Sequence, residues 1–248
     1  MKSILNLEYC KDNHLLLDIY LPNSKDFSVI VYFHGGGLEV GDKAGQNTIE
    51  IAESFVKNGY GFVSCNYRKY PNAKFPDFIL DGAKAVKFVK DNLKVWGGKD
   101  IIISGQSAGA YISLMLCVND KFLLGQGVNP QEISAWLIDS AQTTSHYNVL
   151  KYELGEDCLS QRINEFAPLY YINKETSFSK MLLIFYTNDM PCRYEQNMLF
   201  YSSILAYNKN AKVQYKVLQG EHCAGSSIKD SNGNYPFVLE CLSFLKNN

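Results

Sequence analysis

The sequence predicts an α/β fold with a mostly parallel central sheet of about eight strands and helices on both faces. Short apolar runs of strand length alternate along the chain with segments of helical periodicity, which is the order of parallel strands joined by helical crossovers. The run 28–33 is almost entirely apolar, as expected of a strand buried on both faces. The length of 248 residues suits a single domain, 1–248.

The first half of the chain contains four predicted strands and two predicted helices. In the segment 14–21, leucine and isoleucine occupy every second position, which is the period of a strand. In the segment 77–96, apolar residues recur at steps of three and four, and two glycines follow, as at the end of a helix. The predicted strands are 4–10, 14–21, 28–33 and 61–67, and the predicted helices are 48–58 and 77–96.

The second half continues this alternation, but one long segment interrupts it. Strands are predicted at 100–104, 134–140, 181–187 and 212–218, and helices at 111–118, 194–208 and 236–245. The segment 141–179 contains no clear strand and carries several aromatic residues. We expect short helices that form a small cap there, and an ordinary connection packed on the core is the alternative.

The pattern Gly-x-Ser-x-Gly occurs at residues 105–109, between a predicted strand and a predicted helix. A strand that turns sharply into a helix holds its middle residue at strained backbone angles. Side chains at Gly105 and Gly109 would collide with neighbouring backbone, so the turn requires glycine there. The turn presents the Ser107 hydroxyl above the sheet edge, in front of the free N–H groups of the next helix. Ser107 is therefore the predicted nucleophile.

A second glycine-rich stretch, His34-Gly35-Gly36-Gly37, follows the predicted strand 28–33. A loop of this kind can also bind phosphate, but its spacing matches neither the P-loop pattern nor the dinucleotide-binding pattern. Consecutive glycines instead let backbone N–H groups approach a ligand closely. The amides of Gly36, Gly37 and Ala108 are therefore candidate donors to a developing oxyanion.

Three polar residues of complementary chemistry, Ser107, Asp189 and His222, lie just after predicted strands. The carboxyl ends of parallel strands share one edge of a sheet, so these residues can meet there. A serine hydroxyl is a weak nucleophile unless an imidazole takes its proton and an acid orients that imidazole. Asp139 also lies at the end of a predicted strand and is the rival candidate for the acid.

The chain resembles the α/β-hydrolase fold, whose catalytic residues follow in the order Ser, Asp, His. More narrowly, the motifs 34–37 and 105–109, together with Asn66-Tyr67-Arg68 and Asp81, resemble the hormone-sensitive-lipase branch of esterases, and most of all its small feruloyl-esterase-like carboxylesterases. The chain departs from that branch in its short segment before the first strand, where a helical cap is common. The resemblance implies Asp189 as the acid, and a structural role for His34 and Gly35.

The predicted function is that of a serine carboxylesterase that hydrolyses small to medium esters through an acyl-enzyme intermediate. An amidase, an arylformamidase or a small peptidase on the same fold is the first alternative. A non-catalytic ligand-binding protein on this scaffold is a second, but such a protein would be expected to lose a member of the Ser107, Asp189 and His222 set.

The amino-acid composition bears on which binding partners and cofactors the chain is expected to have. Lys and Arg number 24 and Asp and Glu 25, so no basic surplus suggests nucleic acid or an anionic membrane. The seven cysteines are scattered without a C-x-x-C pair, which suits a reducing cytoplasm. No metal-ligand cluster or nucleotide loop stands out, so we expect no metal and no cofactor. A small-molecule ester is the expected partner, and a homo-oligomer is compatible with the sequence.

Overall fold

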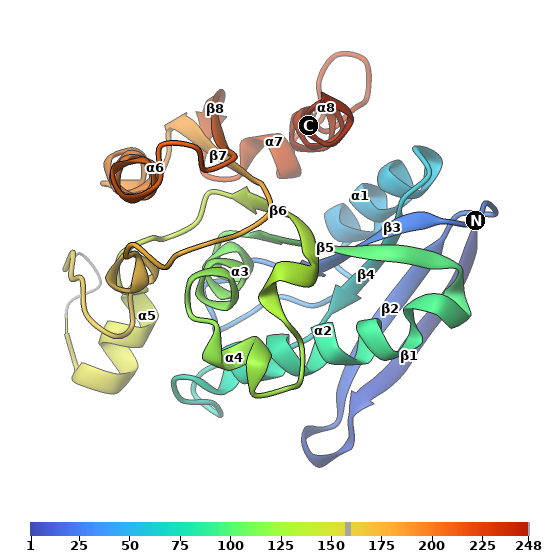
Figure 1. Ribbon diagram of the computed structural model, residues 1–248, viewed down its shortest axis with the longest axis horizontal. Helices are drawn as coiled ribbons and strands as arrows, with labels where there is room; N and C mark the ends of the chain where they lie inside the picture. The colour runs from blue at the N-terminus through green and yellow to red at the C-terminus, as the bar shows by residue number, and fades with distance from the viewer. Residues whose placement is uncertain (157–159, 248) are drawn as a thin grey trace.

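The computed structural model describes residues 1–156 and 160–247, which form one sheet covered by helices (Figure 1). Eight strands lie in the order β1-β2-β4-β3-β5-β6-β7-β8. Their bounds are β1 Lys2–Cys10, β2 Leu15–Leu21, β3 Phe27–Phe33, β4 Gly61–Cys65, β5 Gly98–Gln106, β6 Ile133–Asp139, β7 Met181–Asn188 and β8 Val213–Glu221.

The sheet is mostly parallel, which confirms the prediction. Strand β2 pairs antiparallel with both β1 and β4. The remaining neighbours, from β4 through β3 and β5 to β8, are all parallel. The chain therefore enters the sheet by an antiparallel edge and then builds a parallel core by helical crossovers.

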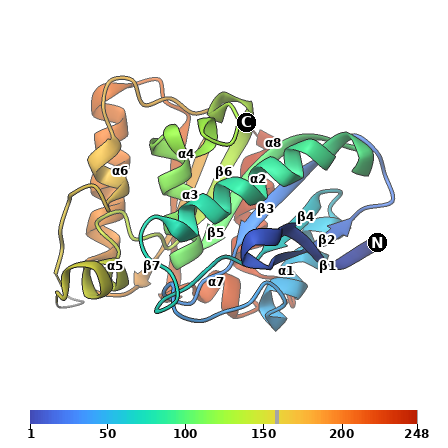
Figure 2. The ribbon, with the colours of Figure 1, turned by 90° about the horizontal axis from the view of Figure 1, so that it is seen from below.

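Helices cover both faces of the sheet. Figures 1 and 2 show α2 and α3 on one side and α1 and α8 on the other, and two separate sets of buried apolar side chains fill the two interfaces. The helices are α1 Gln46–Lys57, α2 Asp77–Trp96, α3 Ala108–Val118, α4 Lys121–Leu124, α5 Tyr147–Val149, α6 Arg193–Tyr207, α7 Ala224–Ser227 and α8 Pro236–Asn247.

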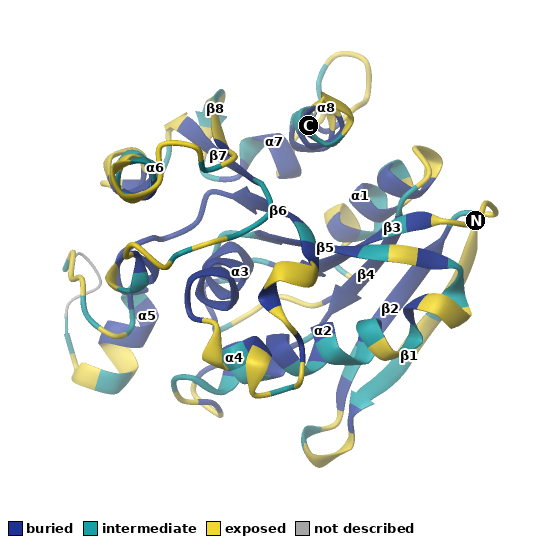
Figure 3. Cartoon of the chain, viewed as in Figure 1, coloured by how far each residue is buried: buried dark blue, intermediate teal, exposed yellow. Residues whose placement is uncertain are grey.

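Burial follows the position of each element in the sheet (Figure 3). All eleven residues of α3 are buried, because this helix follows β5 and packs over the centre of the sheet. The edge strands β1 and β8 expose many of their residues. The turn from β5 into α3 therefore lies over the most deeply buried part of the sheet.

The parallel strands bring distant residues to one edge. The ends of β3, β5, β6, β7 and β8 lead into His34, Ser107, Ser140, Asp189 and His222 respectively. Strand β8 runs to Glu221, three residues beyond its predicted end, so that His222 follows the strand directly.

The segment 141–179 contains no strand among its described residues, as predicted. It holds α5, a π-helical turn at Leu150–Leu154 and a 3-10 turn at Pro168–Tyr171. Whether this segment acts as a cap stays a prediction. Cys158, one of the seven cysteines, lies outside the described residues.

Candidate active site

The turn from β5 into α3 has the crowded geometry that the glycine pattern predicts. Ser107 has φ 54° and ψ −114°, a conformation that is costly for a residue with a side chain. A Cβ atom on Gly105 would strike the carbonyl oxygen of Gly109, and one on Gly109 would strike that of Phe33. The Ser107 amide donates to the Asp139 carbonyl across 2.8 Å, which fixes the turn against β6.

The structure brings Ser107, His222 and Asp189 into one hydrogen-bonded row. His222 Nε2 lies 2.8 Å from Ser107 Oγ, and His222 Nδ1 lies 2.5 Å from Asp189 Oδ1. The Asp189 side chain is 1% exposed and that of His222 is 25% exposed. Burial raises the pKa of Asp189, but the hydrogen bonds from His222 and Ser140 outweigh it and hold the pKa below its usual value. This carboxylate is therefore ionised at neutral pH.

The rival acid Asp139 lies elsewhere. Its Oδ1 accepts a hydrogen bond from the Tyr186 hydroxyl across 2.8 Å, and its Oδ2 accepts one from Ser226 Oγ across 2.5 Å. Burial raises the pKa of Asp139 to about 6. Asp139 is fully buried, and both oxygens of its carboxylate are bonded to residues other than His222.

The glycine loop has free backbone donors. Gly36 and Gly37 adopt φ 117° and 63°, and in the described part of the chain neither amide has a hydrogen-bond acceptor. The Ala108 amide opens α3, where the first N–H groups have no partner within the helix. These are the three amides that the sequence suggested as oxyanion donors.

His34, the first residue of this loop, packs against Tyr67. Its ring stacks on Tyr67 with 4.5 Å between centroids, and the Tyr67 hydroxyl donates to the His34 carbonyl across 2.7 Å. Burial lowers the pKa of His34 to about 4, so the ring is neutral at physiological pH. A Cβ on Gly35 would lie only 3.3 Å from the Gln106 carbonyl, so this glycine lets the loop pass close to the nucleophile turn.

Residues 147–154 contact the same loop and Glu39, which follows it. Asn148 Nδ2 donates to the Gly37 carbonyl across 2.6 Å. Lys151 and Tyr152 both contact the Glu39 carboxylate, at 2.9 and 2.8 Å. One polar contact thus joins this segment to the glycine loop itself, and two more join it to Glu39, which follows the loop.

The remaining histidines lie apart from this row. His14 is exposed and pairs with Glu8, and His146 is buried against the ring of Tyr147. Sequence analysis did not single out Ser140, whose hydroxyl contacts both Asp189 and His222. Its place immediately after Asp139, at a strand end, was the available signal.

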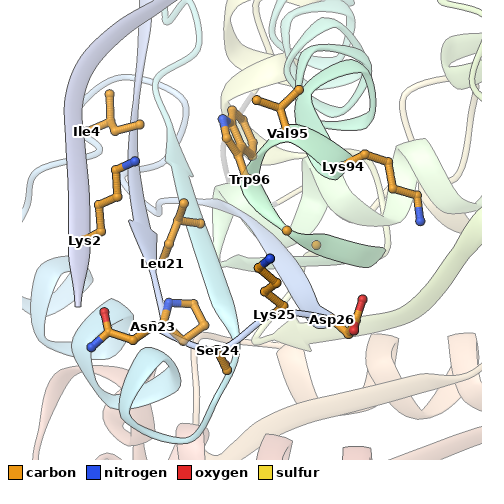
Figure 4. A pocket seen from close by; sticks show the side chains of 13 residues that line it. Lys2, Ile4, Leu21, Asn23, Ser24, Lys25, Asp26, Lys94, Val95 and Trp96 are labelled. Carbon is orange, nitrogen blue, oxygen red and sulfur yellow. The ribbon is translucent and has the colours of Figure 1, made fainter.

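A cavity of about 750 Å³ has none of the candidate site residues in its lining, and Figure 4 shows the side chains that do line it. Leu21, Lys25 and Trp96 are among its lining residues, and it opens beside the first residues of β3 and β5, the edge opposite the serine.

Within residues 1–156 and 160–247, no three His, Cys, Asp or Glu side chains are grouped to hold a metal ion. Over the same residues, no helix has the length and apolarity needed to cross a membrane.

Comparison with known proteins identifies a family model and relatives that each match less than half of this chain. Residues 17–135 match the BD-FAE family model. The isoprenylcysteine alpha-carbonyl methylesterase of Arabidopsis thaliana is 34% identical over 46% of this chain and 27% of its own length. The probable carboxylic ester hydrolase LipM of Mycobacterium tuberculosis is 33% identical over 43% of this chain and 25% of its own length. This chain therefore matches only about a quarter of either relative.

A solved structure extends the likeness to nearly the whole chain. The thermophilic esterase Est2 of Thermogutta terrifontis superposes with a TM-score of 0.76 at 20% identity, over 98% of this chain and 90% of that one. At this identity the likeness establishes the fold. Together with the family match, it confirms the resemblance that the two glycine motifs predict.

Proposed function

For this chain, which has the α/β-hydrolase fold, we propose the activity of a serine carboxylesterase on small to medium esters. The observation that carries the proposal is the row of hydrogen bonds from Ser107 Oγ through His222 to Asp189. The names of the relatives and of the structural neighbour, which are esterases, agree with it.

In the proposed mechanism Ser107 Oγ attacks the carbonyl carbon of the ester while His222 Nε2 takes the hydroxyl proton. The imidazolium then gives this proton to the leaving alcohol, and an acyl-Ser107 ester remains. Water attacks this ester by the same route, with His222 as base, and releases the acid. Asp189 stays ionised throughout and stabilises the imidazolium.

Negative charge develops on the carbonyl oxygen in both steps. We assign its stabilisation to the amides of Gly36, Gly37 and Ala108, which are preorganised by the backbone. Removal of one such donor typically costs about 3 kcal/mol in the transition state. Glycine is required at positions 36 and 37: a Cβ on Gly36 would strike the Val40 carbonyl, and one on Gly37 would strike the Tyr147 hydroxyl.

We propose short acyl groups as the preferred substrates. Residues 147–154 contact the glycine loop and Glu39, and the segment 141–179 to which they belong is modest and interrupted by Pro168, so little chain is available to build a long apolar tunnel over Ser107. The esterase of Thermogutta terrifontis has been solved with propionate and with butyrate bound, which is consistent with short chains.

Two measurements test the proposal. A fluorophosphonate probe should label the wild type and fail to label Ser107→Ala, and equal labelling of both would refute Ser107 as nucleophile. A screen of p-nitrophenyl esters from acetate to palmitate, with acetylated sugars and methyl ferulate, should show the highest kcat/KM on short acyl chains. Hydrolysis of matched anilides and formamides, but of none of the esters, would instead assign the amidase alternative.

A further inference from the structure

One buried hydroxyl beside the acid and the base has no part in the mechanism above. Ser140 directly follows β6, and its side chain is fully buried. Its Oγ lies 2.5 Å from Asp189 Oδ2 and 2.8 Å from His222 Nδ1. It therefore contacts both groups on the side of the imidazole that faces away from Ser107.

The backbone of Ser140 is held in a conformation that serine rarely adopts. Its φ is 53°, in the left-handed region that favours glycine. The Ser140 amide donates to the Ile184 carbonyl across 2.7 Å, and its carbonyl accepts from Arg193 Nη1 across 3.0 Å. Arg193 is only 3% exposed, so it forms a fixed support. Glycine would fit this backbone without strain, which points to a use for the hydroxyl.

The chemistry of the three groups fixes the direction of each hydrogen bond. An ionised carboxylate only accepts, so the single Ser140 proton is donated to Asp189 Oδ2. The lone pairs of the hydroxyl then face the Nδ1–H of His222. The other oxygen, Asp189 Oδ1, accepts from that same N–H and from the Met190 amide at 2.7 Å. Both carboxylate oxygens are thereby held, and the imidazole proton lies between two acceptors.

We propose that Ser140 is a positioning residue of this site, which fixes the Asp189 carboxylate and keeps the His222 ring turned toward Ser107. The inference rests on the proposed esterase function. Ser140 acts through Asp189 and His222, and its hydroxyl is directed away from the place where the substrate binds. Its loss therefore affects proton transfer and leaves substrate binding intact.

Two substitutions separate the hydroxyl from the backbone. Ser140→Gly removes the hydroxyl and accepts the left-handed backbone, whereas Ser140→Ala removes it and keeps the strain. In both variants kcat should fall about 10-fold to 100-fold with KM within about 2-fold of the wild type, because a slightly misplaced base slows the chemical step. Ser64→Ala is the matched control: it deletes another buried hydroxyl, in β4, that has no partner among the described residues, and it should keep the wild-type kcat.

A spectroscopic measurement tests the position of the imidazole without turnover. In proton NMR spectra the Nδ1–H of His222 should give a far-downfield signal in the wild type, and Ser140→Gly should shift it and speed its exchange with water. If the wild type hydrolyses no ester or amide, the esterase proposal fails, while a changed signal in Ser140→Gly still supports the positioning role. An unchanged signal, a wild-type kcat in both variants, or an effect on KM alone would overturn that role.

Discussion

The buried side chain of Asn148 donates a hydrogen bond to the carbonyl oxygen of Gly37, in the loop beside the nucleophile, across 2.6 Å. This contact holds the glycine loop from the segment that follows β6. Because Gly37 is a proposed oxyanion donor, the position of its amide depends on a residue 111 places away in the chain.

Replacement of Asn148 should therefore slow catalysis. Asn148→Ala removes the hydrogen bond to the Gly37 carbonyl, and Asn148→Asp would place a carboxylate against that carbonyl. We expect kcat to fall about 10-fold in Asn148→Ala and further in Asn148→Asp. The fall in Asn148→Ala is smaller than the roughly 10²-fold or more that follows the complete loss of an oxyanion donor. Steady-state kinetics on a p-nitrophenyl ester measures this. Tyr152→Phe, which loses only a bond between two solvent-accessible side chains, is the control, and equal kcat in all four proteins would contradict the prediction.

Substitution at the two aspartates should give opposite results. Asp189→Asn keeps the shape of the acid but can present the wrong imidazole tautomer, so we expect kcat to fall at least about 10²-fold with little change in Tm. Asp139→Asn should keep most of its activity, because Asp139 bonds Tyr186 and Ser226 and not His222. Kinetics and thermal melts of both variants decide this, and the reverse pattern would move the acid to Asp139.

Asp139 should also leave a signature in the pH dependence of stability. Its pKa of about 6 in the folded protein is above the unfolded value of about 3.9. Its contribution to stability is therefore full below about pH 4 and is lost as the pH rises through 6. His34, with a folded pKa of about 4 against an unfolded value of about 6.5, acts in the opposite direction: its contribution is full above pH 6.5 and is lost as the pH falls toward 4.

Asp139→Asn removes the pH-dependent contribution of Asp139 to stability and leaves that of His34. We expect its free energy of unfolding, relative to the wild type, to rise by about 2 kcal/mol between pH 4.5 and pH 8. Urea denaturation at a series of pH values measures the difference. A difference that is constant with pH would show that the Asp139 carboxyl keeps an ordinary pKa in the folded protein.

The buried ion pair between Lys43 and Asp18 should carry a large stability effect. Lys43 Nζ lies 2.8 Å from Asp18 Oδ1, and the two side chains are 5% and 3% exposed. Lys43→Met alone leaves a buried carboxylate without its partner, which typically costs about 3–5 kcal/mol. The double variant Lys43→Met, Asp18→Leu should recover part of this loss. Denaturant titrations test both, and a double variant less stable than Lys43→Met would contradict the expectation.

Local patterns in the sequence were sufficient for much of this protein. Alternation of apolar runs predicted the eight strands and the main helices, and α2 has the bounds that its periodicity indicated, Asp77–Trp96. The turn at Ser107 followed from its two glycines and its local context, a strand before and a helix after. The structure shows, however, that only the crowding at Gly105 comes from residues close in sequence, whereas that at Gly109 comes from Phe33 at the end of β3.

Other features depended on contacts between distant segments. Both Asp139 and Asp189 end strands, so only the directions of their side chains in the folded sheet separate the carboxylate that meets His222 from the one that meets Tyr186. Asn148 lies in the segment 141–179, which has no periodicity, and Ser140 is marked only by its place at a strand end. Strands, helices and tight turns are decided by short-range sterics and apolar spacing, whereas the partners of a buried polar group are decided by which chain segments the tertiary structure brings together.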